Sequence, residues 1–239
     1  MQLDTSTIAI IQLAWSRRLG LDDDALAAAE DDERIYDVQD EASEVSFVRL
    51  FGREVFSGPS WAAKQVRYKS AAELSSDAAL LRLSLDHGGR GTATEHLYYS
   101  DSFPQLPAAG ELAVAEDPQF AEALERLCPP DDVLEAKLAR REALFVLVND
   151  ADPEAPEPLA GAGYSIKDGI LADMGALTAP GHRMRGLGSY VSALAVEDAM
   201  AAGLIPQWRA PFNNMGASRT AAGAGFVPAG LRTSVALPA

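Results

Sequence analysis

Apolar residues recur at helical spacing near the start of the chain. Ile8, Ile11, Trp15 and Leu19 lie three or four positions apart, and Gly20 follows where a helix C-cap would stand. This spacing predicts an amphipathic helix. Residues 21–33 carry acidic runs among alanines and leucines, which predicts a second helix with a solvated acidic face.

Strand and helix patterns alternate in the stretch that follows. Residues 45–59 surround Gly52 with β-branched and aromatic side chains and predict one or two strands. Helices are expected over residues 61–68 and 71–86. The glycines of residues 86–91 then favour a plain turn over an anion cradle, because the chain after them leads into a strand.

The prolines and small residues of segment 102–110 make it the best linker candidate. We therefore expect two units, an appended N-terminal region over residues 1–107 and a second domain over residues 108–239. The first region also alternates strands and helices, as a degenerate relative of the second would.

The second half alternates strands and helices more clearly, with proline-led helix starts after Asp117 and at residue 129. We expect a mixed α/β fold with a largely antiparallel sheet flanked by helices. The expected strands cover residues 112–115, 143–150, 159–166, 169–179 and 205–210 and a final pair within 225–237, and the later helices cover residues 188–202 and 215–224.

Charge narrows the range of partners. The net charge of -15 argues against nucleic acid and against an anionic membrane, and suits a cationic or neutral substrate. The excess of acidic residues does not extend to residues 159–239, which hold 4 acidic and 6 basic side chains. No apolar run approaches the roughly 20 residues that span a bilayer, and no basic segment precedes the first apolar run. We expect a cytoplasmic protein.

The cysteine and histidine content offers no metal chemistry. Cys128 is the single cysteine, which excludes an intramolecular disulfide and any multi-cysteine metal site. The three histidines, His87, His96 and His182, show no metal-ligand spacing. We therefore expect no metal cofactor.

Arginines and glycines gather just before the helix expected at residue 188. Arg183 and Arg185 could pair with a phosphate, and Gly186 and Gly188 would let several backbone amides converge on one anion at the helix start. A solvated arginine pair beside a helix cap is the alternative. ATP and NAD loops are not indicated, because no G-x-x-x-x-G-K-S/T occurs and the third glycine of G-x-G-x-x-G is Val191.

The same loop resembles the GNAT superfamily of acyl-CoA-dependent N-acyltransferases. Its Q/R-x-x-G-x-G/A motif matches Arg183, Gly186 and Gly188 between a strand and a long helix. A second match is the helix after Asn214, which ends on Gly225 and Phe226 as the family's last helix does. The resemblance covers about residues 110–239.

The resemblance implies acetyl-CoA, or another acyl-CoA, as the co-substrate and a primary amine as the acceptor. It places the strand that offers backbone groups to the pantetheine arm just before the loop that wraps the pyrophosphate, and an asparagine that helps to hold the coenzyme. The corresponding residues are Ala176, Leu177, Thr178, Arg183, Met184, Arg185, Gly186, Leu187, Gly188, Ser189 and Asn214.

The sequence departs from the family at the expected catalytic residues. The position of the family's general-acid tyrosine is Ala221, and the strand 205–210 carries no acid. Asp173 is the remaining carboxylate near the expected cleft and is our candidate base, and Ser218 is a weak candidate acid. A solvent-facing Asp173 and a surface Ser218 are the alternatives, and Trp208 is assigned to the core.

Two functions remain open at this stage. The first is an N-acyltransferase that moves an acetyl or other short acyl group from CoA to an amine of a small molecule, peptide or protein by direct attack. The second is a non-catalytic acyl-CoA-binding or interaction module with a degenerate active site. Neither function fixes the oligomeric state, and a homodimer is compatible with both.

Overall fold

The computed structural model describes residues 2–30, 33–104, 112–149 and 156–238. Its contacts divide the chain into two compact units. The N-terminal unit comprises residues 4–98, 209–214 and 228–239, and the C-terminal unit comprises residues 1–3, 99–208 and 215–227. Each unit is therefore built from more than one stretch of the chain.

The expected division at residues 107 and 108 differs from this arrangement in two respects. The first stretch of the N-terminal unit ends at Tyr98 and not at residue 107. The last strand of the chain also belongs to this unit, because it pairs with a strand of the N-terminal half. Much of the proposed 102–110 linker lies outside the described residues.

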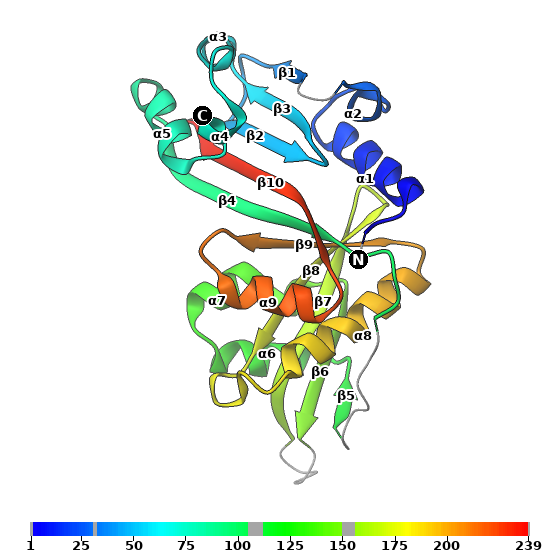
Figure 1. Cartoon of the computed structure of the whole chain (residues 1–239). Helices are drawn as coiled ribbons and strands as arrows, with labels where there is room; N and C mark the ends of the chain where they lie inside the picture. Colours follow the sequence, from blue (N-terminus) through cyan, green and yellow to red (C-terminus); the bar gives the residue numbers. More distant parts are fainter. Residues whose placement is uncertain (1, 31–32, 105–111, 150–155, 239) are drawn as a thin grey trace. The chain divides into compact units, whose positions relative to one another are not determined.

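The strands of the N-terminal unit follow the order β1-β3-β2-β10-β4 in the sheet, with β10 drawn in red in Figure 1. β1 runs parallel to β3, and β2 is antiparallel to both β3 and β10. The elements are α1 (Thr5–Arg18), α2 (Ala25–Ala28), β1 (Arg34–Val38), β2 (Glu44–Leu50), β3 (Arg53–Gly58), α3 (Ser60–Val66), α4 (Ala71–Leu74), α5 (Asp77–Ser84), η1 (Leu85–His87), β4 (Arg90–Tyr99) and β10 (Val227–Ala236).

Helices α3, α4 and α5 cover one face of this sheet. Val45, Phe47 and Val235 point into that core, where they pack against fully buried leucines such as Leu74 and Leu80. Burying one such leucine contributes about 1.5–3 kcal/mol. The first helix, expected from its apolar spacing, is confirmed as α1.

Three expectations for this unit were wrong or incomplete. Among the described residues of segment 21–33, only Ala25–Ala28 form a helix, α2, and an unexpected strand, β1, begins at Arg34. The final pair of strands is one strand, β10, because Gly230 stays within the ladder opposite Leu50 instead of turning. The remaining strands and helices lie close to the predicted ranges.

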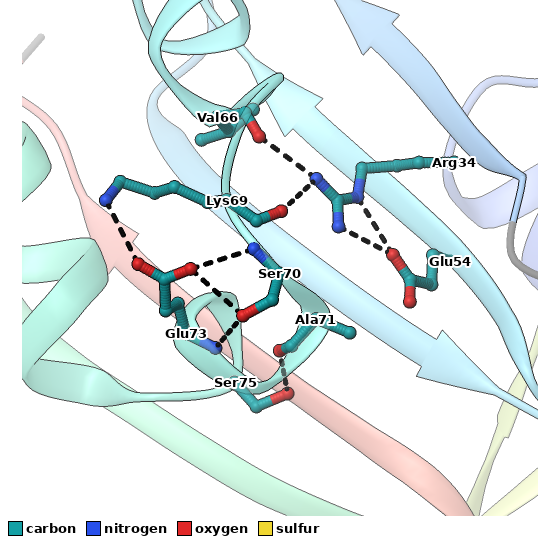
Figure 2. Close-up of polar contacts among 8 residues, drawn as sticks. All are labelled: Arg34, Glu54, Val66, Lys69, Ser70, Ala71, Glu73 and Ser75. Carbon is teal, nitrogen blue, oxygen red and sulfur yellow. Dashed lines mark hydrogen bonds and ion pairs between the residues drawn. The ribbon is translucent and has the colours of Figure 1, made fainter.

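A buried arginine ties β1 to β3 and to the end of α3 (Figure 2). Arg34 donates through Nε and Nη2 to Glu54 at 3.0 and 2.7 Å, and through Nη1 to the carbonyls of Val66 and Lys69 at 3.0 Å. Because both side chains are almost fully buried, the pair matters mainly through the cost of breaking it. These contacts hold the short strand β1 at the edge of the sheet.

The C-terminal unit contains the order β9-β8-β7-β6-β5, in which β5 to β8 are antiparallel and β8 runs parallel to β9. This confirms the mixed α/β, largely antiparallel class. The elements are β5 (Ala113–Ala115), α6 (Pro118–Leu127), α7 (Pro130–Ala136), η2 (Leu138–Arg140), β6 (Ala143–Asn149), β7 (Glu157–Lys167), β8 (Leu171–Thr178), η3 (Pro180–His182), α8 (Leu187–Ala201), β9 (Ile205–Pro211) and α9 (Met215–Gly223).

Helices cover both faces of the strands of the C-terminal unit. Leu144, Val146 and Leu177 pack with α6 on one face. Because side chains alternate along a strand, Met174 and Thr178 of β8 point to the other face, across which α8 lies (Figure 1). No helix among the described residues is long and apolar enough to cross a membrane.

Candidate functional site

The strands β8 and β9 pair over a short stretch and then stop pairing. Their register joins Leu171 to Ile205, Ala172 to Pro206 and Asp173 to Gln207. β8 continues to Thr178 beyond the last of these pairs. Backbone groups on this side of residues 174–178 are therefore not used by the β8–β9 ladder, and these residues include the predicted pantetheine contacts Ala176, Leu177 and Thr178.

The loop after β8 turns sharply into α8. Met184 and Gly186 both have positive φ angles, 62° and 79°. Gly186 is the N-cap residue of α8, no side chain caps the helix, and the first turn carries no acidic residue. The N–H groups of the first turn therefore point out of the helix without a side-chain acceptor, at the positively polarised end of a 15-residue helix.

The two arginines of the loop have different roles. Arg183 donates through Nη2 to Asp132 at 2.6 Å and through Nε to the Thr178 carbonyl at 3.2 Å. It therefore ties the loop to α7. Arg185 is exposed and makes no ion pair with any residue that the structure describes. Arg185 is the loop's freer cation.

Gly188 packs so closely against its neighbours that a residue with a side chain would not fit at this position. A Cβ there would come within 2.9 Å of Thr178 Oγ1, with Thr220 of α9 at 3.8 Å. One turn away in the same interface, a Cβ at Gly223 would come within 2.5 Å of Ser189 Oγ. The first turn of α8 is thus packed between the end of β8 and helix α9.

Asp173, the candidate base, faces the opposite side of the sheet from Thr178. It is 3% exposed and pairs with Arg141, whose Nη1 lies 3.1 Å from Oδ2. Arg141 also donates to the carbonyls of Ala136, Asp173 and Met174 at 3.0, 2.5 and 3.3 Å. Gly175 leaves room for the guanidinium, because a Cβ there would collide with Arg141 Nη2.

The ion pair with Arg141 is enough to explain why Asp173 is buried, without any catalytic role. A carboxylate engaged by a guanidinium is a weaker proton acceptor than a free one. The solvent-facing alternative is excluded by the burial, and the role of Asp173 as a base stays a prediction.

The remaining predicted site residues lie around α9. Ser218 is half-buried, and helical geometry puts it on the opposite side of α9 from Thr220 and Gly223, which contact α8. Ala221 is fully buried. Asn214 precedes α9 directly and belongs by its contacts to the N-terminal unit. The structure thus brings together residues 176–178 with the 183–189 loop, and does not bring Asp173 or Ser218 to that loop.

The C-terminal unit also contains two buried side chains that can ionise, Tyr164 and Cys128. Tyr164 donates to Asp198 Oδ2 at 2.7 Å, and burial together with this hydrogen bond raises the pKa of the tyrosine. Burial likewise raises the pKa of the Cys128 thiol, which lies 3.7 Å from the Thr178 carbonyl. Both groups therefore stay protonated at neutral pH. Trp208 is 4% exposed and meets Phe226 edge-on at 5.8 Å, which confirms its place in the core.

Sequence reasoning missed the residues that support the loop from a distance. Asp132 holds Arg183 from 51 positions away along the chain, and Thr220 lies near Gly188 from the neighbouring helix α9. The acidic first turn of α7 could have suggested a partner for a cation, but no local pattern identifies Arg183 as that cation. Among the described residues, no group of acids, histidines or cysteines is arranged to hold a metal ion.

Neither a family model nor a curated protein matches the sequence. Solved structures that are similar to the chain include an acetyltransferase of the GNAT family from Colwellia psychrerythraea, at 20% identity and a TM-score of 0.46, covering 67% of this chain and 63% of that one. A GCN5-related N-acetyltransferase from Kribbella flavida is 21% identical with a TM-score of 0.48, and the match covers 67% of this chain and 64% of that one. A Drosophila protein is 14% identical with a TM-score of 0.51, and the match covers 66% of this chain and 55% of that one.

The chain thus spans less than two thirds of the length of each of these three proteins. The likeness to the Drosophila structure shows a shared fold and nothing about activity. GNAT acetyltransferases are among the structural neighbours of the chain.

Proposed function

We propose that the chain is an acyl-CoA-dependent N-acyltransferase of the GNAT type. The observation that carries the proposal is the open N-terminus of α8, which follows a strand whose backbone leaves the β8–β9 ladder. A helix start with exposed amides and a nearby cation suits a phosphate group. The match of Arg183, Gly186 and Gly188 to the family motif then favours the pyrophosphate of CoA over other phosphates.

Each part of the loop has a distinct role in this proposal. The amides of Leu187, Gly188 and Ser189 would bind the pyrophosphate, and Arg185 would add charge. Arg183 would hold the loop in place through Asp132. The backbone groups of residues 176–178 that the β8–β9 ladder does not use would take the pantetheine arm.

The proposed reaction needs few side chains. The amine nitrogen attacks the thioester carbonyl, a C–N bond forms, the C–S bond breaks, and CoA leaves as a thiolate. The proton released from the amine passes to water and the thiolate is reprotonated from solvent, because the structure does not bring Asp173 or Ser218 to the α8 loop. A thiol pKa of about 8.5 makes the thiolate an adequate leaving group without a strong acid.

A second candidate is an acyl-CoA-binding module without catalysis. The buried Ala221 at the position of the family's tyrosine and the engagement of Asp173 by Arg141 favour it. We rank it second, because direct attack on a thioester can proceed with water as the proton acceptor. A cytoplasmic location, a metal-free reaction and an amine acceptor remain parts of the first proposal.

The decisive experiment combines binding with turnover. Calorimetry with CoA should show one site per chain, and acetyl-CoA with a panel of primary amines should release free thiol. Binding without thiol release for any amine would favour the second candidate. Absence of CoA binding to the folded chain would reject both.

A matched pair of variants assigns the binding site. Gly188→Glu puts a carboxylate where a Cβ already meets Thr178, whereas Gly181→Glu adds the same charge to the same loop at a position with open space around it. We expect Gly188→Glu to abolish CoA binding and Gly181→Glu to weaken it far less. Equal effects would mean that charge near the loop, and not the helix start, controls affinity.

A further inference from the structure

The residues that line a pocket at the C-terminal end of α1 all belong to the N-terminal unit. Its volume is about 270 Å³, at the small end of the range for ligand sites. Three of its six lining side chains are arginines, in a chain where acidic residues outnumber basic ones by 35 to 20. The lining residues are Trp15, Arg18, Leu19, Glu44, Arg209 and Arg232.

The register of the sheet shows which face bears this pocket. Ala236 of β10 pairs with Glu44 of β2, so Arg232, four positions earlier on β10, points to the same face as Glu44. Val45 and Val235 point to the other face, into the core beneath α3 to α5. The pocket therefore lies between the end of α1 and the sheet face that those helices leave uncovered.

The three guanidinium groups are held differently. Arg232 forms an ion pair through Nη2 with Glu44, and Arg209 Nη1 lies 3.5 Å from Glu95 Oε2. Arg18 makes no ion pair with a described residue, and its guanidinium carbon lies 5.2 Å from the centre of the buried Trp15 ring. Arg18 thus keeps a full charge at the pocket, oriented by an aromatic ring.

The negative end of the helix dipole does not explain this cluster. Basic side chains near a helix C-terminus are common, and they account for Arg17 and Arg18. Arg209 and Arg232 come from strands, and they bring positive charge to the same pocket. The last carbonyls of α1 already accept hydrogen bonds from Leu19, Gly20 and Leu21.

We propose that this pocket binds a small organic oxyanion, a carboxylate or a phosphate ester, with Arg18 as its principal contact. With Arg232 paired to Glu44 and Arg209 paired to Glu95, Arg18 leaves one positive charge at the pocket for a ligand to neutralise. A guanidinium offers several donors in one plane, so Arg232 can contact the anion without releasing Glu44. The site is independent of the α8 loop, and its ligand need not be an acyl-CoA.

Calorimetric titration of the whole chain with succinate and with inorganic phosphate at low ionic strength tests this proposal. We expect binding at one site, with an affinity that falls as salt is added. Preference for succinate or for phosphate identifies the carboxylate or the phosphate source. Titrating succinate into Gly188→Glu protein separates the pocket from the helix start, since that variant changes only the latter.

The matched pair is Arg18→Gln and Arg17→Gln. The two arginines are adjacent on α1, but Arg17 pairs with Asp23 and does not line the pocket. Arg18→Gln should weaken binding about tenfold or more, as loss of a charge-assisted hydrogen bond does, and Arg17→Gln should leave it nearly unchanged. Failure of both anions to bind, or equal weakening in both variants, would overturn the proposal.

Discussion

Helices α6 and α8 belong to the same unit and begin in opposite ways. Asp117 caps α6 by accepting from the Gln119 N–H at 2.9 Å. α8 begins at Gly186, with neither a capping side chain nor an acidic residue in its first turn. A glycine in place of a capping side chain costs only a few tenths of a kcal/mol, and an external anion that binds the open amides can offset it.

Helix α4 of the N-terminal unit extends the comparison (Figure 2). Ser70 accepts from the Glu73 N–H at 3.3 Å, and Glu73 accepts in return from the Ser70 N–H at 2.9 Å. This capping box satisfies donors of α4 with the chain's own atoms. A helix start that is capped in this way has little left to offer a ligand, so the uncapped start is where an anion should bind.

The largest effect is expected from giving α8 the acid that α6 has. Gly186→Asp places a carboxylate at the N-cap, where it would satisfy the open amides and repel a pyrophosphate. We expect CoA affinity to fall about 100-fold or more, measured by calorimetry. Gly186→Asn is the control, because asparagine tolerates the positive φ equally well and adds no charge. Unchanged affinity in Gly186→Asp would mean that the open terminus is not the anion site.

The second prediction separates chemistry from binding. Asp173→Asn tests the candidate base: a general base would lose roughly 100-fold in turnover with CoA affinity unchanged, whereas the burial of Asp173 against Arg141 on the face away from Thr178 predicts near-normal turnover. Glu54→Gln is the matched control, since it breaks the equivalent buried ion pair with Arg34 in the other unit. Both variants should lose stability, because each leaves an arginine buried without its counter-charge. Near-normal turnover by folded Asp173→Asn would leave water as the proton acceptor.

Local signals predicted the parts of the fold that are built from neighbouring residues. Asp117 and Pro118 marked the start of α6, and Asp168 and Gly169 turn between β7 and β8 with positive φ angles where a turn was expected. The glycines around residue 188 marked the start of α8. These predictions succeeded because caps and turns are set by a few adjacent residues.

The parts that failed depend on distant partners. β1 forms because Arg34 meets Glu54, and β10 stays a single strand because it pairs with β2 nearly 190 residues away in sequence. Asp173 was expected near the site from its strand alone, and its contact with Arg141 could not be foreseen. Alternation along a strand says that a side chain points to one face or the other, and not what it meets there.

The third prediction sharpens the contrast between the two loop arginines. Arg185→Gln should lower CoA affinity about tenfold at low ionic strength, because it removes a charge that no acidic side chain of the described part of the chain neutralises. Arg183→Gln should act through the loop, so Asp132→Asn should reproduce its effect while Asp131→Asn should not. If Arg183→Gln and Asp132→Asn shift CoA affinity in opposite directions, Arg183 contacts the coenzyme directly.

The fourth prediction tests the capped helix. Asp117→Ala should lower the free energy of unfolding by about 1 kcal/mol, measured by urea denaturation, because the first turn of α6 loses its acceptor. CoA affinity should not change, since α6 contributes no residue to the loop. A fall in CoA affinity equal to that of Gly186→Asp would show that the two helix starts do not have separate roles.

The smallest effect concerns the capping box of α4 and depends on pH. The hydrogen bonds from the Ser70 backbone and side chain lower the pKa of Glu73 below its ordinary value of 4.5. A carboxyl whose pKa is lower in the folded state stabilises the fold above the unfolded pKa and loses that contribution as pH falls through the folded pKa. Glu73→Gln keeps an acceptor but removes the charge, so the wild-type chain should melt slightly higher than the variant at neutral pH. This difference should vanish below the ordinary glutamate range, and a difference that persists in acid would mean that the box acts through hydrogen bonding alone.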